Sequence, residues 1–119
     1  MAPAAVREQP TSGVLTSPNY REGDEEYPRN FDGFQRIQVP EGNTIWMQFT
    51  DLDLGTKEDF VEVTDKDGTT LGHFNEESHD DPWVEFESRT NMVEVRFHTD
   101  DSSTDDGWEL RWGEFGLIV

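Results

Sequence analysis

The feature that most constrains this fold is a two-residue alternation of apolar and polar side chains. In residues 44–50, Ile45, Met47 and Phe49 alternate with Trp, Gln and Thr side chains. Because successive side chains of a strand point to opposite faces, this pattern predicts a strand with one buried face. Similar runs predict strands at residues 13–17, 34–39, 59–64, 69–75, 83–87, 91–98 and 108–112. No segment has a convincing helical period, so eight or nine short strands predict an all-β, two-layer antiparallel β-sandwich.

The inward phase of these strands predicts the hydrophobic core. Its expected members are Leu15, Ile37, Val39, Ile45, Met47, Phe49, Val61, Val63, Leu71, Val93, Val95, Phe97, Trp108 and Leu110. A chain of 119 residues has the length of one domain. Residues 1–12, rich in Ala and Pro, are expected to form a linker, and residues 13–119 the single sandwich domain. The apolar residues 116–119 either extend the sheet or mark a truncated junction.

The charge balance limits the partners that the chain can bind. It contains 27 Asp and Glu residues against 9 Lys and Arg residues, a net charge of −18. This excess disfavours nucleic acid and anionic membranes, and it favours basic proteins or divalent cations. The chain has no cysteine, which excludes disulfides and thiolate metal sites. No apolar stretch is long enough to insert across a membrane.

Two acidic segments follow predicted strands. Asp51, Asp53, Glu58 and Asp59 lie within nine residues, and residues 99–107 read TDDSSTDDG. Carboxylates this close repel one another. The segments are therefore either solvated turns or parts of a site for a hard cation, which prefers oxygen ligands. Loops of a sandwich gather at its two ends, so the two acidic segments could meet at one of them.

Eight short motifs occur in a fixed order along most of the chain. They are GVLTSPNY at 13–20, YPRN at 27–30, IQVPEG at 37–42, FTDLDL at 49–54, DFVEV at 59–63, LGHF at 71–74, FHTDDS at 97–102 and GW at 107–108. Each is weak alone, but their order and spacing resemble the CUB domain family over residues 12–112. The resemblance implies a jelly-roll-like sandwich that serves as a non-catalytic interaction or adhesion module in secreted or extracellular proteins.

The chain departs from the family pattern at its cysteines. The family usually has four cysteines in two bridges, and three of the matching positions here are Gly33, Thr56 and Asn75. The first has no counterpart, and Gln35 stands where the family usually has tryptophan. Core packing must therefore offset the missing bridges, which commonly contribute a few kcal/mol each.

The resemblance also implies a Ca²⁺ site. The family's ligands match Asp59, Asp100 and the backbone carbonyls near Ser102, and Tyr27 matches a tyrosine that supports a glutamate ligand. That glutamate is Gly55 here, in a turn about four residues shorter than usual. The expected replacements are Asp53, Asp101 or Glu58, although strand alternation sends Glu58 to the face opposite Asp59. A weaker, more hydrated site is expected.

Three classes of function remain open from the sequence. In the first, Asp59 and Asp100, with Tyr27 or His98 alongside, bind an exposed Lys or Arg of a protein partner. In the second, the domain binds carbohydrate through three aromatic side chains, unless these pack in the core: Trp46, Trp83 and Tyr20. The third is an enzyme, which we do not predict, because His73, His79 and His98 match no known ligand or catalytic spacing.

Overall fold

The computed structural model describes residues 12–21, 23, 25–56, 58–76 and 83–116. Within these residues all regular secondary structure is β-strand. The strands are β1 (Ser12–Thr16), β2 (Asp32–Gln38), β3 (Thr44–Asp53), β4 (Phe60–Asp65), β5 (Thr70–Phe74), β6 (Phe86–Glu87), β7 (Met92–His98) and β8 (Gly107–Phe115). Most of the expected linker, residues 117–119 of the apolar tail, and His79 lie outside the described residues, and Ser12 already belongs to β1.

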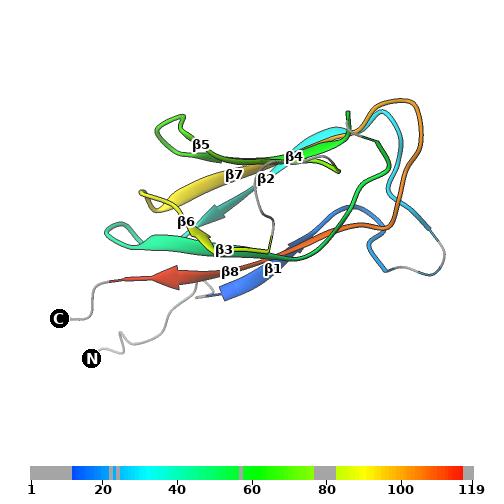
Figure 1. Ribbon diagram of the computed structural model, residues 1–119. Helices are drawn as coiled ribbons and strands as arrows, with labels where there is room; N and C mark the ends of the chain where they lie inside the picture. The colour runs from blue at the N-terminus through cyan, green and yellow to red at the C-terminus, as the bar shows by residue number, and fades with distance from the viewer. Residues whose placement is uncertain (1–11, 22, 24, 57, 77–82, 117–119) are drawn as a thin grey trace.

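The strands form two four-stranded antiparallel sheets that face each other, which confirms the predicted sandwich (Figure 1). One sheet has the order β1-β8-β3-β6 and the other the order β2-β7-β4-β5. Strands β3 and β8 are longer than predicted because they pair with each other over almost their whole length. Strand β6 is shorter than predicted, because it pairs with β3 only at Phe86 and Glu87. Before this strand, the Gln48 side chain donates to the Trp83 carbonyl at 2.7 Å.

The inward faces of the two sheets form the core. All predicted core residues are buried except Leu15 and Leu71, which are partly buried against its margin. The prediction missed further buried side chains: Tyr20, Tyr27, Leu54, Phe74 and Trp112. In place of disulfides, aromatic rings connect the layers: Phe97 of β7 contacts Trp108 of β8 edge to face, and Phe49 of β3 contacts Phe74 of β5 in the same way.

A β-bulge at Thr50 changes which residues of β3 face the core. Phe49 pairs with Leu110, but Asp51 pairs with Glu109, so Thr50 has no partner of its own. An extra residue reverses the alternation beyond it. Leu52 and Leu54 therefore turn toward the core, and Asp51 turns to the outer face, together with Asp53 two residues on.

The loops that carry the acidic segments lie at one end of the sandwich. In Figure 1 the loop before β4, the loop after β7 and the loops between β1 and β2 gather on the right. Strands β4 and β7 are neighbours, and Phe60 pairs with His98 at this end. The residues that precede β4 and follow β7 are thereby brought together.

Candidate calcium and partner site

Asp59 lies directly before β4 and is completely buried. Its Oδ2 accepts a hydrogen bond from the Tyr27 hydroxyl at 2.6 Å, and its Oδ1 accepts one from the Asp100 N–H at 2.9 Å. The Tyr27 hydroxyl in turn accepts the Gly55 N–H at 2.6 Å. Burial, followed by the bond to Asp59, raises the pKa of Tyr27 above its ordinary value. Tyr27 therefore remains a hydrogen-bond donor to Asp59 at neutral pH.

Asp100 organises the loop after β7. Its Oδ1 accepts the Ser102 N–H at 3.0 Å and the Ser102 hydroxyl at 2.9 Å. Its Oδ2 accepts the Thr56 hydroxyl at 3.2 Å, which connects this loop to the loop before β4. The Ser102 N–H is the main cause that lowers the pKa of Asp100 below its ordinary value. Asp100 is therefore ionised at neutral pH, beside the carboxylate of Asp59.

The negative charge of this pair has no cationic side chain as partner within the described part of the chain. None of the ion pairs there involves Asp59 or Asp100. A buried carboxylate is stable only when hydrogen bonds or a counter-ion compensate its lost hydration. The oxygen atoms of Asp59, Asp100 and the adjoining backbone are the ligand type that Ca²⁺ prefers, so the residues present fit this ion.

The surroundings of Gly55 leave no room for the glutamate that the family pattern places at this position. A Cβ atom at Gly55 would lie 2.3 Å from the Ser103 carbonyl oxygen and 2.8 Å from the Thr104 Cα atom. Both contacts are to backbone, so no side chain fits at this position without a shift of the loop. The Ser103 carbonyl occupies the space in which a side chain of residue 55 would begin, and a carbonyl oxygen is also an acceptable Ca²⁺ ligand.

The other predicted site residues lie in different surroundings. Asp101 is exposed in the loop after β7. Asp53 is on the outer face beyond the bulge, where burial and the neighbouring Asp51 raise its pKa to about 6. His98 stacks on the Phe60 ring, with centroids 5.2 Å apart, and its Nδ1 is 3.6 Å from the Asp32 carboxylate. Asp59, Asp100, Ser102 and Tyr27 are thus the predicted residues that hydrogen bonds join into one group.

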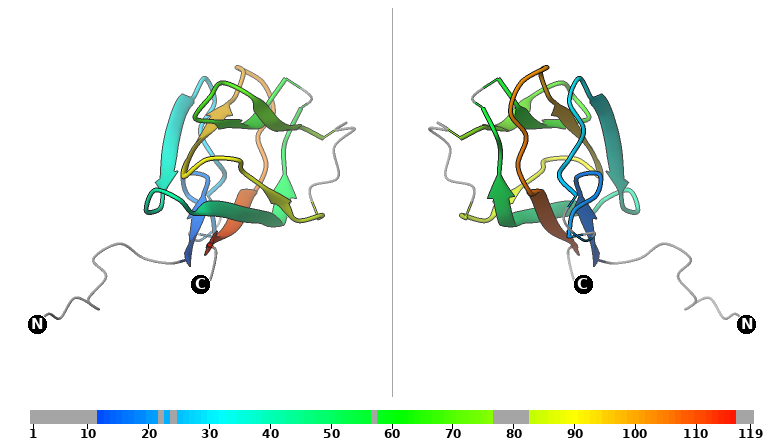
Figure 2. Two further views of the ribbon diagram at one scale, coloured as in Figure 1. Left: turned by 90° about the vertical axis from the view of Figure 1, so that its left-hand side faces the viewer. Right: turned by 90° about the vertical axis from the view of Figure 1, so that its right-hand side faces the viewer.

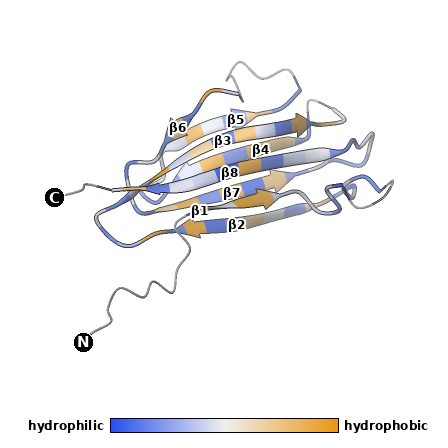
Figure 3. Cartoon of the chain, turned by 90° about the horizontal axis from the view of Figure 1, so that it is seen from below, coloured by the Kyte–Doolittle hydropathy of each residue, from blue (hydrophilic) through white to orange (hydrophobic). Residues whose placement is uncertain are grey.

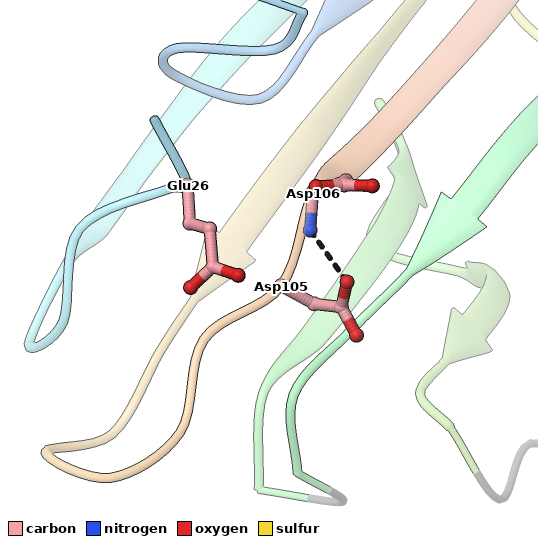
Figure 4. A group of neighbouring side chains, drawn as sticks. All are labelled: Glu26, Asp105 and Asp106. Atoms are coloured by element: carbon pink, nitrogen blue, oxygen red, sulfur yellow. Dashed lines mark hydrogen bonds between the residues drawn. The ribbon is translucent and has the colours of Figure 1, made fainter. Parts of the chain in front are cut away.

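A further acidic group was not predicted from the sequence. The carboxylate oxygens of Glu26, Asp105 and Asp106 come within 4.8 Å of one another (Figure 4). The Thr104 hydroxyl also bonds the Glu26 carboxylate, which joins the loop before β2 to the loop before β8. The acidic runs were visible in the sequence, but their pairing depends on the topology of the sandwich.

Comparisons with known proteins agree with this architecture. The CUB domain family model matches residues 6–112. A cubilin homolog of Caenorhabditis elegans is 29% identical over 126 aligned positions, covering 90% of this chain but only 3% of the relative. Human MASP-1/3 CUB1-EGF-CUB2 has a TM-score of 0.75 at 21% identity, covering 91% of this chain and 43% of that one. The MASP-1 CUB2 domain, whose crystal structure contains bound Ca²⁺, has a TM-score of 0.69 at 20% identity, covering 88% and 94%.

The chain therefore belongs to the CUB domain family, whose members are interaction modules of extracellular proteins and are generally non-catalytic. It spans a small fraction of the curated relative that it matches. Among the described residues there is no helix of the length and apolarity that crossing a bilayer requires.

Proposed function

We propose that this domain is an extracellular, calcium-binding interaction module that binds a basic side chain of a protein partner at its acidic end. The observation that carries the proposal is the pair of Asp59 and Asp100, which share a hydrogen bond and have no cationic partner among the described residues. A bound Ca²⁺ would supply the missing positive charge. Carbonyl groups near Ser102 and Ser103 are the nearby oxygens that the family resemblance adds to the two carboxylates.

The exposed and buried members of the site have different roles in this proposal. Tyr27 and Asp59 are 1% and 0% exposed, so Asp59 would face the ion from inside while the Tyr27 hydroxyl holds its carboxylate in place. Asp100 is half-buried, and Asp101 is exposed, so these side chains face a partner. A Lys or Arg of the partner would approach the carboxylates on this side, and His98 lies at the adjoining end of β7. Such a contact is sensitive to salt, because exposed charges are screened.

A thermal melt with added Ca²⁺ tests the ion. Millimolar Ca²⁺ should raise Tm, since an ion that binds only the folded state stabilises it by mass action. Extracellular modules bind Ca²⁺ at roughly 10⁻⁴–10⁻³ M. Because general screening also stabilises a chain of charge −18, the control is NaCl at matched ionic strength. An equal rise in Tm with NaCl would contradict the calcium site.

A second candidate, carbohydrate binding, is favoured by the position of Trp46. Trp46 lies between the buried residues Ile45 and Met47 of β3, so its side chain is on the outer face of the β1-β8-β3-β6 sheet. Figure 3 shows the sandwich from the side of this sheet. The Trp46 ring crosses Gly113 of β8, where a Cβ atom would be only 2.3 Å from the indole nitrogen. An indole that lies against a sheet can stack on a sugar ring. Tyr20 is not available for this role, because it is 9% exposed and its hydroxyl bonds Asp51.

A glycan array with the parent protein and Trp46→Ala tests the second candidate. Carbohydrate binding through this face should disappear in the variant, whereas the calcium-dependent rise in Tm should remain. Signals that are equal for both proteins, or absent from both, would contradict a role of Trp46 in sugar binding.

A further inference from the structure

A cavity of about 400 Å³ opens at one side of the sandwich, between β1 and β2. Both are edge strands, one in each sheet, and the end-on views show them along the same side of the two layers (Figure 2). Phe97 and Trp108, 2% and 1% exposed, contribute the inner wall, and Phe34 contributes to the lining while remaining 61% exposed. Ligand cavities commonly have this size. The apolar part of the lining, which suits a large apolar side chain, is formed by Phe31, Phe34, Val95, Phe97 and Trp108, and a polar part is formed by Thr16, Ser17, Asn19 and Gln35.

The cavity is neutral in a highly charged protein. None of its lining residues is charged, although the chain has 27 acidic and 9 basic side chains. The Gln35 side chain closes part of the gap by donating from Nε2 to the Thr16 carbonyl at 3.2 Å. In the wall, Trp108 keeps a buried Nε1–H that no described residue accepts. Buried polar groups are normally satisfied, so this N–H is an exception in the wall.

The cavity adjoins two acidic loops of the molecule, the loop before β2 and the loop before β8. Asn19 is a lining residue, and its Nδ2 donates to the backbone carbonyl of Glu26 at 3.1 Å. Ser17, also in the lining, accepts the N–H of Trp108 at 3.0 Å, and Trp108 lies two residues after Asp106. The two loops that carry Glu26, Asp105 and Asp106 therefore border the wall of the cavity.

We propose that this cavity is the anchor site for a partner segment in which one large apolar side chain is flanked by Lys or Arg. The apolar side chain enters the neutral cavity, and the flanking cations lie against the carboxylates of Glu26, Asp105 and Asp106. Buried apolar anchors dominate many protein interfaces, and complementary charge promotes encounter. This inference rests on the proposed basic partner for its flanking charges, but it does not depend on the calcium ion.

Three short peptides test the proposal by isothermal titration calorimetry in EDTA-containing buffer. They are acetyl-Lys-Lys-Phe-Lys-Lys-amide, its Ala counterpart with the central Phe replaced, and acetyl-Glu-Glu-Phe-Glu-Glu-amide. The first should bind roughly tenfold more tightly than the Ala peptide, the factor expected from burial of one aromatic ring. The Glu peptide should not bind. Equal affinities for the Phe and Ala peptides, or for the Lys and Glu peptides, would overturn the proposal.

Two variants test whether the Phe peptide binds in the cavity. Gln35→Trp adds bulk where the two edges meet, and Phe34→Ala removes an exposed part of the lining with little expected effect on folding. Each should abolish the preference for the Phe peptide, and a preference that survives in Phe34→Ala would overturn the assignment even if Gln35→Trp does not fold. If Phe34→Ala instead abolishes self-association measured by ultracentrifugation, and no peptide binds, the occupant is a second copy and the proposal is overturned.

Asp100→Asn separates this inference from the calcium site. The variant should keep the Phe preference while its Ca²⁺ affinity falls by roughly tenfold or more. If the parent protein binds Ca²⁺ but does not prefer the Phe peptide, only the cavity proposal is contradicted. If it prefers the Phe peptide but does not bind Ca²⁺, only the calcium site is contradicted.

Discussion

Two pairs of aspartates near one end of the sandwich have opposite electrostatic surroundings. Asp59 and Asp100 accept hydrogen bonds from hydroxyl and backbone N–H donors, and the pKa of Asp100 is lowered. Asp51 and Asp53 lie beyond the bulge of β3, where burial and mutual proximity raise the pKa of Asp53 to about 6. Asp51 also has a donor, the Tyr20 hydroxyl, and the Arg21 guanidinium lies 3.9 Å away, so the contrast lies in the second member of each pair. Hydrogen bonds favour the charged form of Asp100, whereas burial and a neighbouring carboxylate disfavour the charged form of Asp53.

The largest effect is expected from Tyr27→Phe. This change removes the hydroxyl that donates to the buried carboxylate of Asp59 and accepts the Gly55 N–H. Hydrogen bonds to charged groups contribute about 1.5–3 kcal/mol, so the free energy of unfolding should fall by about 2 kcal/mol. Urea denaturation in calcium-free buffer measures this change. An unaffected midpoint would show that the Asp59 charge is compensated by other means.

The matched change in the other pair is Tyr20→Phe. The Tyr20 hydroxyl also donates to an aspartate, Asp51, at 2.6 Å, and burial, followed by this bond, raises its pKa to about 12. Asp51 is only partly buried, so water can replace the lost donor. The same denaturation experiment should show a loss of about 1 kcal/mol or less. A loss equal to that of Tyr27→Phe would remove the contrast between the two pairs.

Asp53→Asn should stabilise the protein at neutral pH. The pKa of Asp53 is about 6 in the folded state and near 3.8 in the unfolded state, so the folded state holds more protons between these pH values. The contribution of this group to stability therefore falls as pH rises from about 4 to about 6. The variant should have a higher Tm than the parent at pH 7, and the difference should shrink at pH 4. Thermal melts across this range check the sign, and a difference independent of pH would contradict it.

Local patterns in the sequence predicted most of the fold. Strand alternation identified the buried faces because it depends on adjacent residues alone. The bulge at Thr50 was missed, although the spacing from Phe49 to Leu52 already breaks the two-residue period. Asp53 was expected to replace the missing glutamate ligand, whereas the structure turns it to the outer face beyond the bulge.

Contacts between distant loops were only partly predictable. The family motifs suggested that Asp59 and Asp100 belong together, and the pairing of β4 with β7 explains their proximity. The closeness of Glu26 to Asp105 has no local signal, because it depends on how the loop before β2 folds against the loop before β8. The close approach of Ser103 to Gly55 requires the glycine, but the sequence alone does not indicate which loop packs there.

The central claim is that Asp100 belongs to a calcium site, and Ca²⁺ titration of two matched variants tests it most directly. Asp100 and Asp67 both accept the N–H two residues onward, and the pKa of each is lowered first by that bond. Asp100→Asn and Asp67→Asn therefore remove one charge each from similar turns, of which only the first lies beside Asp59. Calorimetry should show Ca²⁺ affinity reduced by roughly tenfold or more in Asp100→Asn, since ligand charge sets affinity, and unchanged in Asp67→Asn. Equal Ca²⁺ affinity in both variants and the parent would contradict the account.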